Sequence, residues 1–230
     1  MQKTKQSTKT LKILTTISAF AGVMLSVFSA IDDNFTHRYK RLMYFTAQSN
    51  LWIGFTFLAL LLLPLLKVKN QEKRKEQLYV FKYVFTVSIT MTGLVFCAVL
   101  APFAPPDYRP WAFCNVLTHV VTPILAIADF LLDDYKIRLT VRHCLYALLP
   151  FLIYFSLASV LGAFGVDFGR GEPYPYFFMD YHSPVGIFGV GRVRPYLGSF
   201  YWWTLFSLLA LLIAYAYAKI NNKKQEKRVR

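Results

Sequence analysis

The sequence predicts an all-α membrane protein, built as a polytopic bundle of six transmembrane helices. Hydrophobic residues make up 56% of the 230 positions although the formal net charge is +14, a combination that a soluble domain of this size does not normally have. The charged residues gather between long apolar runs and at both ends of the chain. Six of these runs are long enough to cross a hydrocarbon core of roughly 30 Å, which takes ~20 residues in a helix.

We expect one domain over residues 1–230, because neither an internal repeat nor a linker is visible. The predicted spans are residues 11–31, 44–66, 78–101, 112–132, 143–165 and 199–218. The first span is read as a retained helix, since no short apolar region with a small-residue cleavage site precedes it. Along this span Ser18, Gly22 and Ser26 recur every four residues, so one face should allow a neighbouring helix to approach closely.

The distribution of Lys and Arg predicts the orientation of the spans. Eighteen of these cations lie in the N-terminal tail, the second and fourth connections and the C-terminal tail, whereas seven lie in the other connections. Because cytoplasmic segments carry the excess of positive charge, both termini should be cytoplasmic and the protein should lie in the cell membrane. The cations flank membrane spans, so we expect them to contact anionic lipid headgroups and not nucleic acid.

The long connection over residues 166–198 should lie on the outer side. It is rich in Gly, Pro and aromatic residues, with the run Tyr-Pro-Tyr-Phe-Phe at 174–178. This composition suits a segment that folds over the mouth of the bundle, and it is equally typical of an interfacial aromatic belt.

Polar side chains follow one face of the second span. A polar group surrounded by hydrocarbon is costly unless it faces the bundle interior and finds a partner. Thr46, Ser49 and Asn50 stand at positions i, i+3 and i+4, which share a helix face. We therefore expect these three side chains to point into the bundle.

The fourth span carries a second polar stripe, formed by Asn115, Thr118, His119 and Thr122 at offsets 0, 3, 4 and 7. A histidine within a span is either a neutral group satisfied by its neighbours or a functional base. Pro123 favours the second reading, because it offers no N–H to the carbonyl of residue 119 and so predicts a kink beside the imidazole.

A base at His119 calls for a hydroxyl at similar depth, since a hydroxyl becomes a good nucleophile only when a base takes its proton. Thr46 is the best placed by depth, and Ser49 and Thr118 remain alternatives. Threonine within a membrane helix usually bonds to its own backbone instead.

At these residues the chain resembles the androgen-induced membrane protein family, which has a bacterial branch. Its members are six-helix proteins that include threonine hydrolases of fatty acid esters of hydroxy fatty acids. The family's catalytic pair is a Thr near the start of the second helix and a His in the fourth. The matching positions are Thr46 within Tyr-Phe-Thr-Ala-Gln-Ser-Asn and His119 within Asn-Val-Leu-Thr-His, and the segment 174–178 also resembles a family segment.

The resemblance implies an integral-membrane hydrolase that cleaves a lipid ester taken from the bilayer, with no cofactor and no metal. Thr46 would accept the acyl group, and His119 would act first as base and then as acid. Such chemistry also needs donors for the oxyanion. Asn50 and Asn115 are the candidates, and interhelical hydrogen bonding is an equally good account of both.

Two other functional classes stay open. A small transporter or channel would line its pathway with Asn50, Asn115, His119 and Asp129. The concentration of polar residues in the outer half argues against it, as does the lack of paired Gly/Pro breaks. Asp129, near the cytoplasmic end, is expected to reach the lipid headgroups. A non-catalytic lipid-binding protein would need only the pocket.

Overall fold

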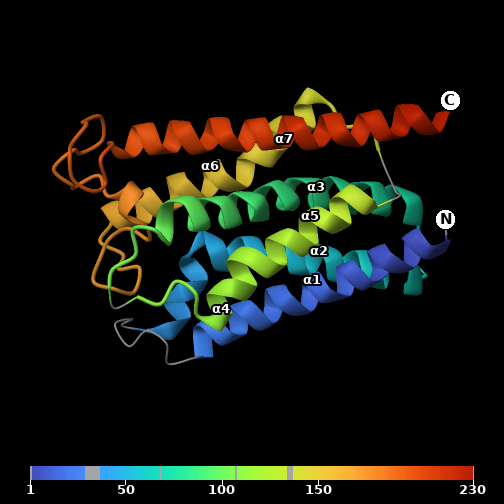
Figure 1. Ribbon diagram of the computed structural model, residues 1–230, viewed down its shortest axis with the longest axis horizontal. Coiled ribbons are helices and arrows are strands. Elements are labelled where there is room, and N and C mark those ends of the chain that lie inside the picture. Colours follow the sequence, from blue (N-terminus) through green and yellow to red (C-terminus); the bar gives the residue numbers. More distant parts are fainter. Residues whose placement is uncertain (1, 29–36, 68, 107, 134–136, 230) are drawn as a thin grey trace.

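The structure is a computed structural model that describes residues 2–28, 37–67, 69–106, 108–133 and 137–229. Within these ranges the chain is helical without strands, and six helices are long and apolar enough to cross a membrane. The predicted all-α class and the six spans are therefore confirmed. In Figure 1 the helices run along the long axis of the molecule, with both chain ends at one end and the long loop at the other.

In chain order the helices are α1 (Gln2–Phe28), the 3₁₀ helix η1 (Arg38–Met43), α2 (Phe45–Leu62), the 3₁₀ helix η2 (Leu63–Leu65), α3 (Gln71–Val95), the π-helical η3 (Phe96–Leu100), α4 (Phe113–Val116), the π-helical η4 (Leu117–Val121), α5 (Thr122–Leu132), α6 (Val141–Ala163), the 3₁₀ helix η5 (Phe177–Met179) and α7 (Ser199–Val229). The fourth span thus consists of α4, η4 and α5 in one continuous run.

Three helices extend well beyond the predicted spans. α1 begins at Gln2 where the prediction began at residue 11, α3 begins at Gln71 where it began at residue 78, and α7 continues to Val229 where it ended at residue 218. These extensions are rich in Lys, Gln and other polar residues, and Lys and Gln favour helix without favouring hydrocarbon. Glu72 in the first turn of α3 also complements the helix dipole. Residues 29–31, Lys136 and Arg230, all part of the sequence predictions, lie outside the described residues.

The bundle places apolar side chains outward and many polar side chains inward. Leu208 and Leu212 of α7 are 61% and 64% exposed, whereas Ser49, Asn50 and Thr86 are fully buried. This is the distribution expected in a bilayer, where lipid accepts Leu and an unpaired polar group is costly. α3 is the central helix, since it contacts α2, α5, α6 and α7.

α1 approaches the fourth span closely along its face of small residues. A Cβ atom on Gly22 would lie only 2.7 Å from Thr118 Cγ2, so no larger residue fits without movement. One turn earlier, Ser18 Oγ lies 2.9 Å from Thr122 Oγ1. The predicted close-packing face of the first span is confirmed.

A cluster of four charges, here called the ion cluster, joins α1, α3 and the end of α5. Lys12 Nζ lies 2.8 Å from Asp129 Oδ1 and 3.1 Å from Asp133 Oδ2, and Lys82 pairs with both carboxylates. The side chains of Lys82 and Asp129 are completely buried. The expectation that Asp129 reaches the headgroups is wrong, because two ammonium groups hold it inside the bundle and offset its charge.

The long loop after α6 folds over the end of the bundle opposite the termini. Phe168, Phe178 and Met179 are almost fully buried and belong to the same apolar cluster as residues of α6 and α7. Lys40 Nζ, in η1, lies 2.7 Å from Asp167 Oδ2 and ties the loop to the start of α2. The predicted cap over the mouth of the bundle is therefore confirmed.

Candidate active site

The structure brings the second and fourth spans together at Thr46 and His119. Thr46 is the second residue of α2, and His119 lies in the middle of η4. Thr46 Oγ1 is 3.1 Å from His119 Nε2, which is a hydrogen-bond distance. A hydroxyl and an imidazole from different helices thus face each other.

Hydrogen bonds on the far side of the imidazole set its tautomer. His119 Nδ1 lies 3.0 Å from the Asn115 carbonyl oxygen and 3.0 Å from Thr118 Oγ1. The Thr118 hydroxyl itself donates to the Cys114 carbonyl at 3.0 Å, so it offers Nδ1 a lone pair. Since both neighbours accept, Nδ1 carries the proton and Nε2 is left to accept one from Thr46.

The third span holds the ring of His119 in place. The Phe96 ring stacks on the imidazole with centroids 3.7 Å apart and planes 20° apart. In the same span, a Cβ on Gly93 would lie 2.9 Å from the carbonyl oxygen of His119, so the two helices touch backbone to backbone. These contacts bury the histidine and leave it little freedom to rotate.

The helix of the fourth span is irregular just before Pro123, as predicted from the missing N–H of that residue. η4 is π-helical, and the N–H of Thr122 bonds to the Leu117 carbonyl. The Thr118 carbonyl then has no donor within the helix, because Pro123, the next residue in line, has no N–H. The prediction placed the freed carbonyl at residue 119. The π turn frees the Thr118 carbonyl as well, and Asn50 Nδ2 donates to it at 3.1 Å.

Asn50 and Ser49 connect helices beneath the pair. Asn50 Nδ2 donates to the carbonyls of Thr46 at 2.8 Å and Thr118 at 3.1 Å, which uses both of its amide hydrogens. Ser49 Oγ donates to the Thr46 carbonyl at 3.1 Å and lies 2.8 Å from Thr92 Oγ1 in α3. Asn50 is therefore placed as an interhelical link and not as an oxyanion donor.

Asn115 supports the site through its carbonyl. Its amide nitrogen donates to Tyr108 Oη and to the Arg109 carbonyl, both at 3.0 Å, and so anchors the segment before α4. Both amide hydrogens are used in this way. The contribution of Asn115 to the pair is the carbonyl that orients His119, not a donor for an oxyanion.

Tyr176 is a site residue that sequence reasoning missed. Its hydroxyl lies 3.5 Å from Thr46 Oγ1 and accepts a hydrogen bond from the Thr46 backbone N–H at 3.4 Å. Burial raises the pKa of Tyr176 to about 12, so the hydroxyl stays protonated at neutral pH and can donate. The only sequence signal was its place in the aromatic run 174–178, and periodicity says nothing about the path of a loop.

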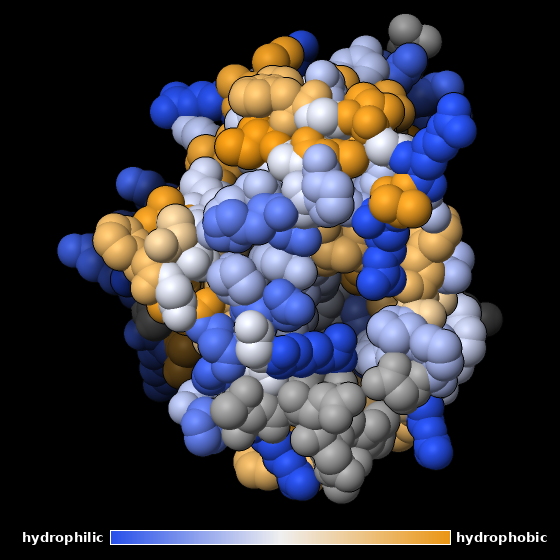
Figure 2. All heavy atoms as spheres, turned by 90° about the vertical axis from the view of Figure 1, so that its left-hand side faces the viewer, coloured by the Kyte–Doolittle hydropathy of each residue, from blue (hydrophilic) through white to orange (hydrophobic). Residues whose placement is uncertain are grey.

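A cavity of about 330 Å³ lies above the pair. Its lining includes Thr46, Asn115, Thr118, His119 and Tyr176, together with apolar and basic side chains from the loops. Figure 2 shows this end of the molecule, where hydrophilic residues gather around a hollow near the middle of the face.

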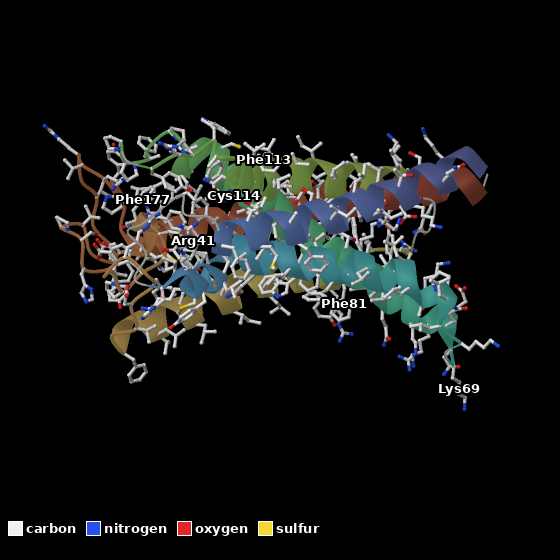
Figure 3. All side chains as sticks on the ribbon, turned by 90° about the horizontal axis from the view of Figure 1, so that it is seen from below. Arg41, Lys69, Phe81, Phe113, Cys114 and Phe177 are labelled. Carbon is white, nitrogen blue, oxygen red and sulfur yellow. The ribbon has the colours of Figure 1, made fainter. Side chains whose placement is uncertain are left out.

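The cavity lies at the loop end of the bundle. Figure 3 places three of its lining residues, Arg41, Cys114 and Phe177, at that end, with Lys69 at the opposite end. A smaller cavity of about 30 Å³, lined mainly by aromatic and aliphatic side chains, touches Thr46 and Tyr176 from another side. Thr46 thus lines both a larger cavity with apolar, polar and basic side chains and a smaller, apolar one.

The residues proposed for a transport pathway do not share one passage. Asn115 and His119 line the cavity, whereas Asn50 is buried between helices and Asp129 belongs to the ion cluster. In the described part of the chain, no three His, Cys, Asp or Glu side chains are grouped so that they could hold a metal ion.

No protein-family model, no curated protein and no solved structure matches this chain.

Proposed function

We propose that the protein is an integral-membrane hydrolase that cleaves fatty acyl esters with Thr46 as nucleophile and His119 as base. The observation that carries the proposal is the 3.1 Å contact between Thr46 Oγ1 and His119 Nε2, with Nδ1 bonded to the Asn115 carbonyl. A nucleophile, a base and a group that orients the base, at the edge of a cavity, are the parts that acyl transfer needs.

In the proposed reaction, His119 Nε2 takes the hydroxyl proton as Thr46 Oγ1 attacks the ester carbonyl. Collapse of the tetrahedral intermediate breaks the ester C–O bond, and the imidazolium gives its proton to the leaving alkoxide. Water, deprotonated by the same Nε2, then attacks the acyl-threonine. The bond between the acyl carbon and Thr46 Oγ1 breaks, the imidazolium returns the proton to Oγ1, and the fatty acid is released. Phe96 and the buried surroundings keep the imidazole aimed at Thr46 between turnovers.

Tyr176 and the start of α2 are the proposed stabilisers of the oxyanion. The Tyr176 hydroxyl is protonated and lies beside the attacking oxygen. Thr46 stands in the first turn of α2, where the end of the helix dipole is positive and favours a developing negative charge. Preorganised donors of this kind contribute more to acyl transfer than the base alone.

The proposed substrate is a lipid ester that enters from the bilayer, such as a fatty acid ester of a hydroxy fatty acid. The apolar residues around both cavities suit acyl chains. The matched motif residues Thr46 and His119 also support membership of the bacterial branch of the androgen-induced membrane protein family.

An activity-based probe tests the nucleophile directly. A phosphonylating lipid probe should form an adduct on Thr46 of the purified protein, located by peptide mass spectrometry. Thr46→Ala should lose the adduct, whereas Thr56→Ala should keep it, because Thr56 is a buried threonine of the same helix that donates to the Trp52 carbonyl. An adduct on Ser49 or Thr118 would exclude Thr46 as the nucleophile.

We also propose that the end holding both termini faces the cytoplasm of the cell, where its Lys and Arg residues contact anionic lipids. The excess of cations and the shared position of the termini in Figure 1 support this. In a variant without native cysteines, an impermeant maleimide should label exposed His182→Cys in intact cells. It should label Lys223→Cys only after permeabilisation, and the reverse pattern would invert the orientation.

A further inference from the structure

Tyr154, in α6, carries a buried hydroxyl near Thr46. The residue is 5% exposed and lines the smaller cavity together with Thr46 and Tyr176. Its hydroxyl lies near the Phe45 backbone and the Tyr176 hydroxyl, but it makes no hydrogen bond of normal geometry with any described residue. A buried donor without an acceptor is unfavourable, so a hydroxyl of this kind calls for a functional explanation.

Aromatic packing fixes the ring of Tyr154. The centre of the Phe45 ring lies 5.1 Å from the centre of the Tyr154 ring, and the centre of the Tyr176 ring lies 6.5 Å from it. Phe45 is the first residue of α2 and directly precedes Thr46. The ring of Tyr154 therefore packs against the start of the helix that carries the proposed nucleophile, and its hydroxyl is positioned before a ligand arrives.

The smaller cavity has room for a single small group. Its volume of about 30 Å³ is close to the share of one molecule in liquid water, so a carbonyl oxygen fits there. The polar side chains among its described lining residues are Thr46, Thr92, Tyr154 and Tyr176. The Thr92 hydroxyl already donates to the Ser88 carbonyl at 3.1 Å. The two tyrosines are thus the hydroxyl donors that a ligand in this cavity would meet.

The two cavities give the two ends of an ester different places. His119 lines the larger cavity but not the smaller one. In the proposed reaction His119 protonates the leaving alkoxide, so the alcohol part of the ester lies on the side of the larger cavity. The carbonyl oxygen occupies another corner of the tetrahedral carbon. The smaller cavity is the space next to Thr46 that His119 does not border, and it is therefore the place for this oxygen.

We propose that the smaller cavity receives the carbonyl oxygen of the ester and that Tyr154 is a second hydrogen-bond donor to it, beside Tyr176. As Thr46 Oγ1 bonds to the carbonyl carbon, the π electron pair of the C=O bond moves onto the oxygen, and the proton of Oγ1 passes to His119 Nε2. Donors in an apolar, preorganised site stabilise that oxygen more than water does. The inference deepens the proposed function and rests on it, because it adds a catalytic residue to the same reaction.

The variant Tyr154→Phe tests the donor in the hydrolysis assay. It should lower kcat about 10²-fold with little change in KM, since the hydrogen bond strengthens only as the oxyanion forms. Tyr83→Phe is the control, because Tyr83 is a buried tyrosine of α3 that donates to the Ala214 carbonyl at 2.8 Å and lines neither cavity. The control should keep the wild-type kcat per folded molecule. An equal loss of kcat in Tyr83→Phe would overturn the proposal.

Thermal stability separates a catalytic from a structural hydroxyl. Tyr154→Phe removes a buried donor that has no partner, so the melting temperature should stay the same or rise. Tyr83→Phe leaves the Ala214 carbonyl without its donor, so the melting temperature should fall. A large drop for Tyr154→Phe would show that its hydroxyl serves the fold and would overturn the proposal.

A long-chain alkyl trifluoromethyl ketone tests the oxyanion without turnover. Thr46 Oγ1 should add to its carbonyl carbon, the carbonyl oxygen should become an alkoxide, and the hydroxyl proton should move to His119. Fluorine NMR in detergent micelles distinguishes this adduct from the free ketone and its hydrate. Tyr154→Phe should weaken adduct formation at least about tenfold, because the adduct resembles the tetrahedral intermediate. The corresponding trifluoromethyl alcohol, which forms no adduct, should bind equally to both proteins.

The outcomes separate this inference from the hydrolase proposal. Undiminished adduct formation in Tyr154→Phe would overturn the role of Tyr154 and leave the Thr46 chemistry standing, and so would equal weakening of ketone and alcohol, which points to ordinary binding. A wild-type protein that forms no adduct with the ketone or with the phosphonylating probe would overturn the hydrolase proposal, and this inference with it.

Discussion

Thr46→Ala and His119→Ala should each lower ester hydrolysis by at least about 10³-fold, because each removes a member of the proposed catalytic pair. The double variant should be no slower than the slower single variant, since such members act non-additively. Thr46→Ser keeps a hydroxyl near Nε2 and should retain measurable turnover. The measurement is ester cleavage per folded molecule, with folding judged by size-exclusion profile.

The variant Tyr176→Phe tests, in the same assay, whether the Tyr176 hydroxyl stabilises the oxyanion of the tetrahedral intermediate. Loss of one donor should lower kcat by about 10² to 10³ with KM little changed. Because the pKa of Tyr176 is about 12, its hydroxyl stays protonated as pH rises through neutrality. The wild-type rate should therefore show no loss from deprotonation of Tyr176 below strongly alkaline pH.

Near-wild-type activity in Thr46→Ala or His119→Ala would remove that residue from the mechanism and favour a non-catalytic lipid-binding protein.

Breaking the ion cluster should produce the largest loss of stability in the bundle. Lys82→Met leaves two carboxylates facing one ammonium group, and Asp129→Asn leaves two ammonium groups facing one carboxylate. Removing one partner of a buried pair typically costs about 3 to 5 kcal/mol. Both variants should unfold at clearly lower denaturant concentration or temperature in detergent, with the free energy of unfolding as the measured quantity.

The double variant Lys82→Met with Asp129→Leu is the sharper test. It leaves the neutral pair of Lys12 and Asp133, 3.1 Å apart, and should recover much of the lost stability, since an apolar replacement for a buried pair is often tolerated. Lys75→Met is the control, because its pair with Glu72 is a 4.0 Å contact of exposed groups and such pairs contribute about 0 to 1 kcal/mol. Additive losses in the double variant would contradict the pairing.

The six spans could be read from the chain because hydrocarbon imposes a simple local rule, ~20 apolar residues per crossing. The close approach at Gly22 and the irregular helix before Pro123 were also predictable. The missing side chain of Gly and the missing N–H of Pro change the structure at their own positions, so the local sequence is enough to predict both effects. The starts of α1 and α3 and the end of α7 were not, because the end of the apolar run marks the membrane surface and not the last helical residue.

The roles of the polar residues depended on how the helices are rotated against one another. Periodicity put Asn50 on the same face as Thr46, but the approach of η4 directs its amide to the Thr118 carbonyl. The sequence alone predicted that Asp129 reaches the headgroups, whereas in the structure it pairs with Lys12 of α1 and Lys82 of α3 inside the bundle. Hydrogen bonds and ion pairs between distant segments need both partners in place, and no local pattern carries the position of the second partner.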